Sequence, residues 1–112
     1  MKITYAQKAA PMPNPHKINA ALIYDTEHAQ VVHITLEAGE KLFRHITPVD
    51  VFFFVLEGRG IVEIGDEKKE VEADALIESP AGIPHCWYNE SDSRLRVMVV
   101  KVPKPTKQTQ LL

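Results

Sequence analysis

The sequence is poor in cysteine, with Cys86 the only one among 112 residues. A single thiol cannot form a disulfide within the chain, and no second cysteine is present to build a Cys-based zinc site. Proteins without these devices are typical of a reducing compartment. We therefore expect a cytoplasmic protein.

Long apolar runs are also missing. The longest uninterrupted run, Val51 to Leu56, is far shorter than the ~20 residues that a membrane-spanning helix needs. Residues 1–15 contain no apolar stretch of the kind that a signal peptide carries. The sequence therefore predicts a soluble protein that is not exported and has no membrane partner.

Neither sign of charge dominates the chain. The net charge is −2, the pI is near 6.2, and lysine and arginine are interspersed with aspartate and glutamate. No basic stripe is available to follow a phosphate backbone, so we expect no nucleic-acid partner. The lysines near the C-terminus fall among prolines, which favours an extended, solvated tail.

Helical patterns are absent too, because no segment shows a 3.6-residue apolar stripe with caps at both ends. Apolar and polar residues instead alternate with period two, and turn residues interrupt the alternation every few positions. This pattern predicts an all-β fold with short strands at 31–36, 42–47, 51–57, 61–64, 71–73, 75–78, 85–89 and 95–102.

Turn residues suggest how these strands connect. "EGRG" offers Gly58 and Gly60 as positive-φ positions for a tight hairpin, and "GDEKKE" is expected to be a second turn. One domain is predicted, since a chain of this length buries roughly two thirds of its unfolded surface. Its expected parts are an N-terminal arm (1–15), a β-barrel domain (16–102) and a C-terminal tail (103–112).

One segment has a recognisable spacing. In "PAGIPHCWYN", Pro80, Gly82, His85 and Asn89 follow the pattern P-x-G-x-x-H-x-x-x-N. The proline stiffens a corner, the glycine permits a backbone conformation that a Cβ would block, and the next strand carries the histidine inward.

A second, weaker pattern lies upstream, where Gly39, His45 and Gly58 keep their spacing. Together the two segments resemble the signature motifs of the cupin superfamily, from about Val31 to Val100. The resemblance implies a double-stranded β-helix, that is, a jelly-roll barrel.

The resemblance also implies a divalent metal held by two histidines and a glutamate of the first motif and one histidine of the second. Here Thr47 stands at the place of the second histidine and Val51 at the place of the glutamate. Neither side chain replaces imidazole or carboxylate as a ligand. The expected metal ligands are therefore His45 and His85 alone, with iron, manganese, nickel or zinc held incompletely.

Other residues are less favoured as members of the same site. Asp50 is adjacent to the vacant carboxylate position and would point inward only if a β-bulge follows Pro48. His33 alternates with apparent core residues, which favours an outward position. His16 and His28 are expected to be exposed, and Cys86 to be a buried or interface thiol.

These residues predict a mainly apolar pocket with a few polar groups, the usual character of a small-molecule site. The favoured hypothesis is the binding of a small polar molecule. The alternatives are a metal-dependent dioxygenase or isomerase with an unrecognised third ligand, and a metal-free epimerase or isomerase with a histidine general base. The predicted lining residues are His45, Thr47, Val51, Phe53, His85 and Trp87.

Consecutive aromatic residues at 52–54 place rings on both faces of one strand. The outer face of that sheet is therefore expected to be covered. We expect a homodimer, in which residues 17–25 could be an exchanged strand, because outward apolar patches usually mark interfaces. The alternative is that the arm covers Phe52 and Phe54 within the same chain.

Overall fold

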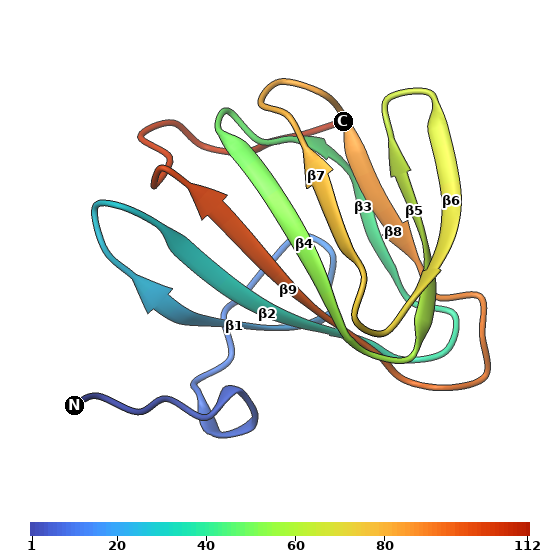
Figure 1. Cartoon of the computed structure of the whole chain (residues 1–112), viewed down its shortest axis with the longest axis horizontal. Helices are drawn as coiled ribbons and strands as arrows, with labels where there is room; N and C mark the ends of the chain where they lie inside the picture. Colours follow the sequence, from blue (N-terminus) through green and yellow to red (C-terminus); the bar gives the residue numbers. More distant parts are fainter.

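The computed structural model describes residues 1–112 and consists of two five-stranded antiparallel sheets that face each other (Figure 1). The first sheet has the order β1-β2-β9-β4-β7 and the second the order β10-β3-β8-β5-β6. The strands are β1 Asn19–Asp25, β2 Gln30–Leu36, β3 Lys41–Ile46, β4 Asp50–Glu57, β5 Arg59–Ile64, β6 Glu67–Glu72, β7 Leu76–Ser79, β8 His85–Tyr88, β9 Leu95–Val102 and β10 Gln110–Leu111. The predicted all-β jelly roll is confirmed.

The core lies between the sheets and follows the predicted alternation. On β4 the residues Val51, Phe53 and Val55 are buried, while Phe52 and Phe54 point outward and are half-buried. Burial of alternate residues from both sheets removes their apolar surface from water, which is the main stabilising contribution to such a fold.

An irregularity in β3 decides which way its polar residues point. Leu42 pairs with Trp87 and His45 pairs with His85, so β3 has one more residue than β8 between these two pairs. This β-bulge reverses the alternation, because residues three apart in a regular strand point to opposite faces. Leu42 and His45 are therefore both buried between the sheets, whereas Phe43 is 45% exposed.

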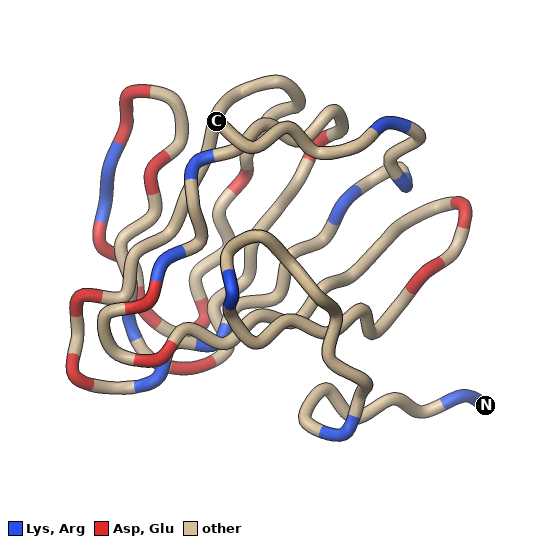
Figure 2. The backbone as a smooth tube through the Cα atoms, turned by 180° about the vertical axis from the view of Figure 1, so that it is seen from behind, with Lys and Arg blue, Asp and Glu red and all other residues tan.

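Two expectations about polar segments are wrong. "GDEKKE" is not wholly a turn, because only Gly65 and Asp66 turn and residues 67–72 form β6. This strand is a sheet edge, where charged side chains remain in water and discourage pairing with other chains. β6 forms a hairpin with β5, and Figure 2 shows charges of both signs along it.

The C-terminal tail is not wholly solvated either. Gln110 pairs with Ile46 and Leu111 with His45, so the end of the tail forms the edge strand β10 beside the bulged strand β3. The Leu112 N–H also donates to the Arg44 carbonyl at 3.0 Å. Alternation could not reveal a strand of two residues that depends on a partner far away in the sequence.

The hairpin between β4 and β5 uses its glycines in two different ways. Gly58 has φ +82°, as the turn prediction requires, but the φ of Gly60 is not positive. A Cβ on Gly60 would instead lie 2.5 Å from Leu95 Cδ2. Gly60 is therefore needed for close packing over the core rather than for the turn.

The N-terminal arm contains the only helical segment, the short 3₁₀ turn Ala6–Lys8. No helix in the structure has the length and apolar character that crossing a bilayer requires. The arm leads into β1, which pairs with β2 of the same chain.

Candidate functional site

A cavity of about 270 Å³ lies at one end of the space between the two sheets. We call this end the mouth and the cavity the mouth cavity. Arm residues 12–16 line one side, and Thr109 and Leu111 of the tail line another. Its floor is mainly aliphatic, and its polar side chains include His45, Thr47 and Lys101. Arm and tail, which the sequence left outside the domain, therefore both form walls of the site.

Two histidines meet beside this cavity. His45 Nε2 lies 3.0 Å from His85 Nε2, and the ring centroids are 4.4 Å apart in an edge-on arrangement. The residues are forty positions apart, and the bulge in β3 together with the pairing of β3 and β8 brings them together. The sequence predicted that these two imidazoles would meet inside the barrel, and the structure places them there.

The hydrogen bonds of the pair fix where its protons lie. His45 Nδ1 is 2.6 Å from the Phe43 carbonyl, which can only accept, so Nδ1 carries the proton of a neutral His45. His85 Nε2 then donates to the bare His45 Nε2, and Ser79 Oγ donates to His85 Nδ1 at 2.7 Å. A directed chain therefore runs from the Ser79 hydroxyl through both rings to the Phe43 carbonyl.

Burial keeps both imidazoles neutral. It lowers the pKa of His85 to about 3, and the neighbouring His45 and Lys101 act in the same direction. Burial also lowers the pKa of His45, against the opposing effect of its hydrogen bond to the Phe43 carbonyl. Desolvation disfavours the charged form of each ring, and two cations this close would repel each other.

A third imidazole, from His16, reaches the site although the sequence suggested an exposed residue. Its ring centroid is 5.2 Å from that of His45, and its Nδ1 accepts the Phe43 N–H at 2.8 Å. Burial and then the neighbouring His45 lower the pKa of His16 to about 4. In the bulge, the Phe43 carbonyl thus accepts a hydrogen bond from His45, and the Phe43 N–H donates one to His16.

Lys101 is another residue at the site that was not predicted from the sequence. It follows Leu95, Val97 and Val99 at the inward positions of β9 and lines the cavity. Burial lowers the pKa of its ammonium group. The signal was present in the sequence, since simple continuation of the alternation beyond Val99 reaches Lys101.

The predicted lining residues separate into two groups. His45 and Thr47 line the cavity. His85 does not line it, although its Nε2 lies 3.3 Å from Thr47 Oγ1. Phe53 and Trp87 are fully buried with ring centroids 5.5 Å apart and do not line it. Their rings fill the interior that the prediction left open, and His85 lies between them and the mouth.

Val51 faces the core but does not reach the mouth cavity. Its neighbour Asp50 is exposed, and the Asp50 carboxylate accepts the Ala81 N–H at 2.8 Å. Because β4 stays regular at this point, the bulge that would turn Asp50 inward does not form. Asp50 therefore does not complete a site with the histidines.

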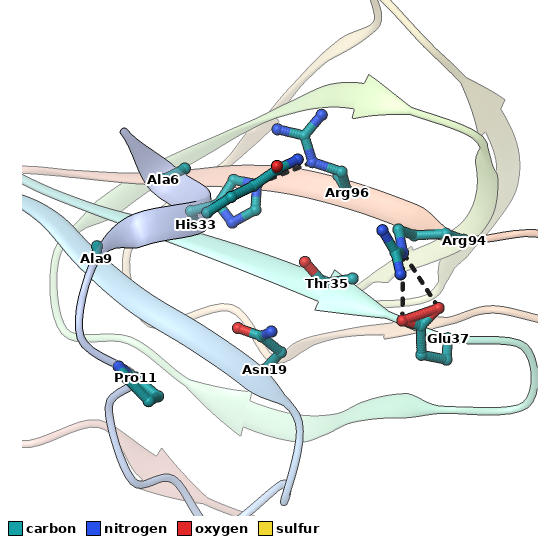
Figure 3. A pocket seen from close by; sticks show the side chains of 10 residues that line it. Ala6, Ala9, Pro11, Asn19, His33, Thr35, Glu37, Arg94 and Arg96 are labelled. Carbon is teal, nitrogen blue, oxygen red and sulfur yellow. Dashed lines mark hydrogen bonds and ion pairs between the residues drawn. The ribbon is translucent and has the colours of Figure 1, made fainter. Parts of the chain in front are cut away.

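His33 lies on the opposite face of its sheet, as the alternation favours. Its Nε2 accepts a hydrogen bond from Arg96 Nε at 3.1 Å, in a separate cavity of about 360 Å³ beneath the arm (Figure 3). Arg94 and Glu37 form an ion pair in the same cavity. The arm thus passes over this part of the sheet, and His33 does not approach the histidine pair.

The cupin resemblance implies a metal, so the donor set has to be compared with what a metal needs. A separation of 3.0 Å between two imidazole nitrogens suits a shared proton and also two neighbouring ligands of one ion. However, no group of three His, Cys, Asp or Glu side chains is arranged to hold an ion. Enzyme-bound transition metals usually have at least three protein ligands, so the residues present do not fit a resident metal.

Comparisons with known proteins agree with this architecture. The model of the family described as "Cupin domain" matches residues 32–101. Among solved structures, TT1209 from Thermus thermophilus is 28% identical with a TM-score of 0.80, covering 94% of this chain and 100% of TT1209. The polyketide cyclase RemF from Streptomyces resistomycificus has a TM-score of 0.84 at 16% identity, covering 100% of this chain and 85% of RemF, a likeness of fold alone.

Among curated relatives, the uncharacterized protein YrkC of Bacillus subtilis is 32% identical over 88 residues, which is 72% of this chain and 47% of YrkC. The chain therefore spans about half the length of that relative. The family match covers well over half of the chain and includes both motifs, the histidine pair and Lys101. The chain belongs to the cupin family.

Proposed function

We propose that this cupin binds a small polar molecule in the mouth cavity, against a wall that contains His45, whose ring is hydrogen-bonded to His85 beside it. The observation that carries the proposal is the pair itself, two neutral imidazoles held 3.0 Å apart beside a cavity. Burying imidazoles in an apolar interior costs free energy unless their nitrogens are hydrogen-bonded. Here every nitrogen of the pair has a partner, so the wall is rigid before any ligand arrives.

The character of the cavity supports the same proposal. Aliphatic side chains form its floor, and a small number of polar groups converge on it, which is the usual composition of a small-molecule site. Its volume of about 270 Å³ lies just below the usual range for ligand pockets. The ligand is therefore small.

We propose that any divalent metal is bound weakly and incompletely by His45 and His85. His85 would first have to release its Nε2 proton and donate from Nδ1 to Ser79 instead. Metal analysis of purified protein after dialysis should find far less than one equivalent. A full equivalent that survives dialysis and disappears in His45→Ala would contradict this and favour a metal-dependent enzyme.

A metal-free isomerase is supported less well than binding. Its base would be a histidine, but the Nε2 lone pair of His45 already accepts the proton of His85. An acid is needed as well, and Tyr88 lies on the outer side of β8, where its hydroxyl is hydrogen-bonded to Cys86 Sγ at 3.3 Å. That bond and then burial raise the pKa of Tyr88 to about 12.

Replacement of His45 by alanine tests the proposed site. We would record imidazole proton NMR spectra of the protein during titration with a fixed panel of small carboxylates, sugars and phenols. At least one class should shift the His45 and His16 signals, and His45→Ala should abolish its binding while His28→Ala, on the exposed turn before β2, leaves it intact. If no probe perturbs these signals, the cavity is not a binding site.

We also propose a homodimer formed through the outer face of the first sheet. Phe52 pairs with Val100 and Phe54 with Met98 on that face, and Leu76 beside Phe54 is 54% exposed. A contiguous apolar patch of this kind is typical of a contact between copies. Light scattering after size exclusion should give a dimer that Leu76→Glu weakens, and a monomeric wild type would contradict the proposal.

A cytoplasmic location is proposed on the state of the single thiol. Cys86 is 1% exposed, and burial raises its pKa, so it is an inert reduced thiol that suits a reducing compartment. Fractionation of cells that produce the protein should recover it with cytoplasmic markers. Recovery in the medium or with membranes would contradict this.

A further inference from the structure

We propose that the ligand of the mouth cavity is a small carboxylate with a compact apolar body, and that the ammonium group of Lys101 binds its carboxylate. This inference rests on the proposed binding function and names its ligand class. It depends on the placement of Lys101, on the polar groups around it and on the composition of the cavity floor.

Lys101 is a cation at a position that the rest of its strand uses for the core. Its cross-strand neighbours are Gln30 on β2 and Val51 on β4, and neither carries a charge. The chain has six ion pairs, and Lys101 belongs to none of them. A partly buried charge without a partner is unfavourable, so a residue of this kind points to a counter-ion from outside the chain.

The cavity offers hydrogen-bond donors but no anion. None of its lining residues is aspartate or glutamate, although the chain has 15 acidic residues. His16 accepts at Nδ1 from the Phe43 N–H, so its neutral ring carries the proton on Nε2 and has a donor to spare. Thr47 and Thr109 add hydroxyl groups. A ligand that supplies acceptors and negative charge complements this set.

The histidine pair strengthens the preference. Both nitrogens of His45 are already used, one donating to the Phe43 carbonyl and the other accepting from His85. The pair therefore offers no free lone pair to the hydroxyl or amide N–H of a ligand. Lys101 is left as the strongest recognition group in the cavity, and a carboxylate forms a charge-assisted hydrogen bond with it.

The floor limits the remainder of the ligand. Val32, Ile34, Leu42 and Val99 form an aliphatic surface beneath Lys101, and Leu111 of the tail faces the same space. Such a surface favours a hydrocarbon or aromatic body and disfavours a sugar ring, whose hydroxyls would lose hydrogen bonds to water. The small volume excludes long acyl chains.

Matched acid and amide pairs test the inference in the wild-type protein. Benzoate would be compared with benzamide and butyrate with butyramide, using calorimetry and the NMR signals of His16 and His45. Each acid should bind about ten- to a hundredfold more tightly than its amide, because a hydrogen bond to a charged group is lost in the amide. Inorganic phosphate, which lacks an apolar body, should bind more weakly than benzoate.

Variants then assign the effect to Lys101. Lys101→Met should weaken benzoate to the level of benzamide and leave benzamide unchanged, Lys101→Arg should retain most of the preference, and Lys107→Met, outside the cavity, should match the wild type. If amides bind as tightly as acids, or Lys101→Met has no effect, the carboxylate inference is overturned and the binding function stands. Phosphate binding as tight as benzoate also overturns it. If none of these probes binds but a sugar or a phenol does, only the carboxylate inference fails, and if sugars and phenols do not bind either, both proposals fail.

Discussion

The two ends of the space between the sheets differ in chemistry although the same strands build them. Along β9 the inward side chains are Leu95, Val97 and Val99 and then Lys101. The first two of these are completely buried, whereas Lys101 reaches the cavity at the mouth. One regular strand therefore leads from the closed core to the proposed binding site within a few inward positions.

The second sheet makes the same change. We call the end of the space that Phe53, Trp87 and Leu95 fill the closed half. On β8 the inward Trp87 packs against Phe53 there, and two residues earlier His85 joins the polar network at the mouth. Phe53, Trp87 and Val97 of the closed half have no exposed surface, whereas the buried histidine pair and its partners Thr47 and Ser79 lie at the mouth. This separation suggests that the closed half carries the stability of the fold and the mouth carries its function, as is common for binding sites on rigid scaffolds.

Phe53→Ala should give the largest effect and addresses the closed half. The side chain is completely buried and contacts the rings of Trp87 and His85, so its removal leaves a cavity that neighbours cannot fill. We expect a loss of about 3–5 kcal/mol in the free energy of unfolding. Urea denaturation followed by the fluorescence of Trp87 measures it, and a loss below about 1 kcal/mol would show that the closed half is not the stabilising part.

Alanine substitution of two glycines with positive φ, one at each end, compares how tightly the two ends are packed. Gly58 (φ +82°) lies in the turn between β4 and β5, where a Cβ would collide with the Arg94 carbonyl, while Gly82 (φ +78°) lies beside Thr47 with open space around it. Gly82→Ala should cost only the left-handed backbone strain, about 1–2 kcal/mol. Gly58→Ala should cost more, because Arg94 must move as well. Equal losses in urea denaturation would contradict the difference in packing.

Acid should destabilise the folded protein through the buried histidines of the mouth, because the closed half contains no such group. Titration of His16 allows a test. Its pKa is about 4 in the folded protein against 6.5 for the free side chain. Between these two pH values the unfolded chain binds a proton at His16 that the folded protein does not bind. Stability present above pH 6.5 is therefore lost as the pH falls toward 4.

His16→Asn keeps an acceptor for the Phe43 N–H and removes this titration. The variant should lose less stability than the wild type between neutral pH and about pH 4, and the two should differ by a constant above about pH 7. Urea denaturation across this pH range provides the measurement. Parallel curves throughout would show that His16 is not held neutral by burial.

The sequence predicted the closed half better than the mouth, for a physical reason. Period-two alternation is a local pattern, and both the strands and the inward positions of Phe53 and Val55 on β4 follow from it. The turn at Asp74 follows from local chemistry in the same way, because aspartate tolerates the φ of +75° that the turn requires.

The mouth depends on contacts that local patterns do not encode. The bulge in β3 breaks the alternation, so the inward position of His45 follows from the cupin resemblance and from the pairing with β8, not from the local pattern. His16 and Leu111 reach the cavity from segments that look like loose ends in the sequence. The hydrogen bond between Ser79 and His85 likewise depends on how the chain folds back and not on a local pattern.

Lys101→Met should give the smallest change in stability and the opposite sign. Burial lowers the pKa of this ammonium group, so the folded protein holds the charge at a cost that an apolar side chain of similar length avoids. We expect the free energy of unfolding to rise by up to about 1 kcal/mol, within the usual gain from removing a residue kept for function. A stabilised variant that no longer distinguishes benzoate from benzamide would show that this inward position of β9 serves binding. A marked loss of stability would mean that Lys101 belongs with Leu95 and Val97 in supporting the fold.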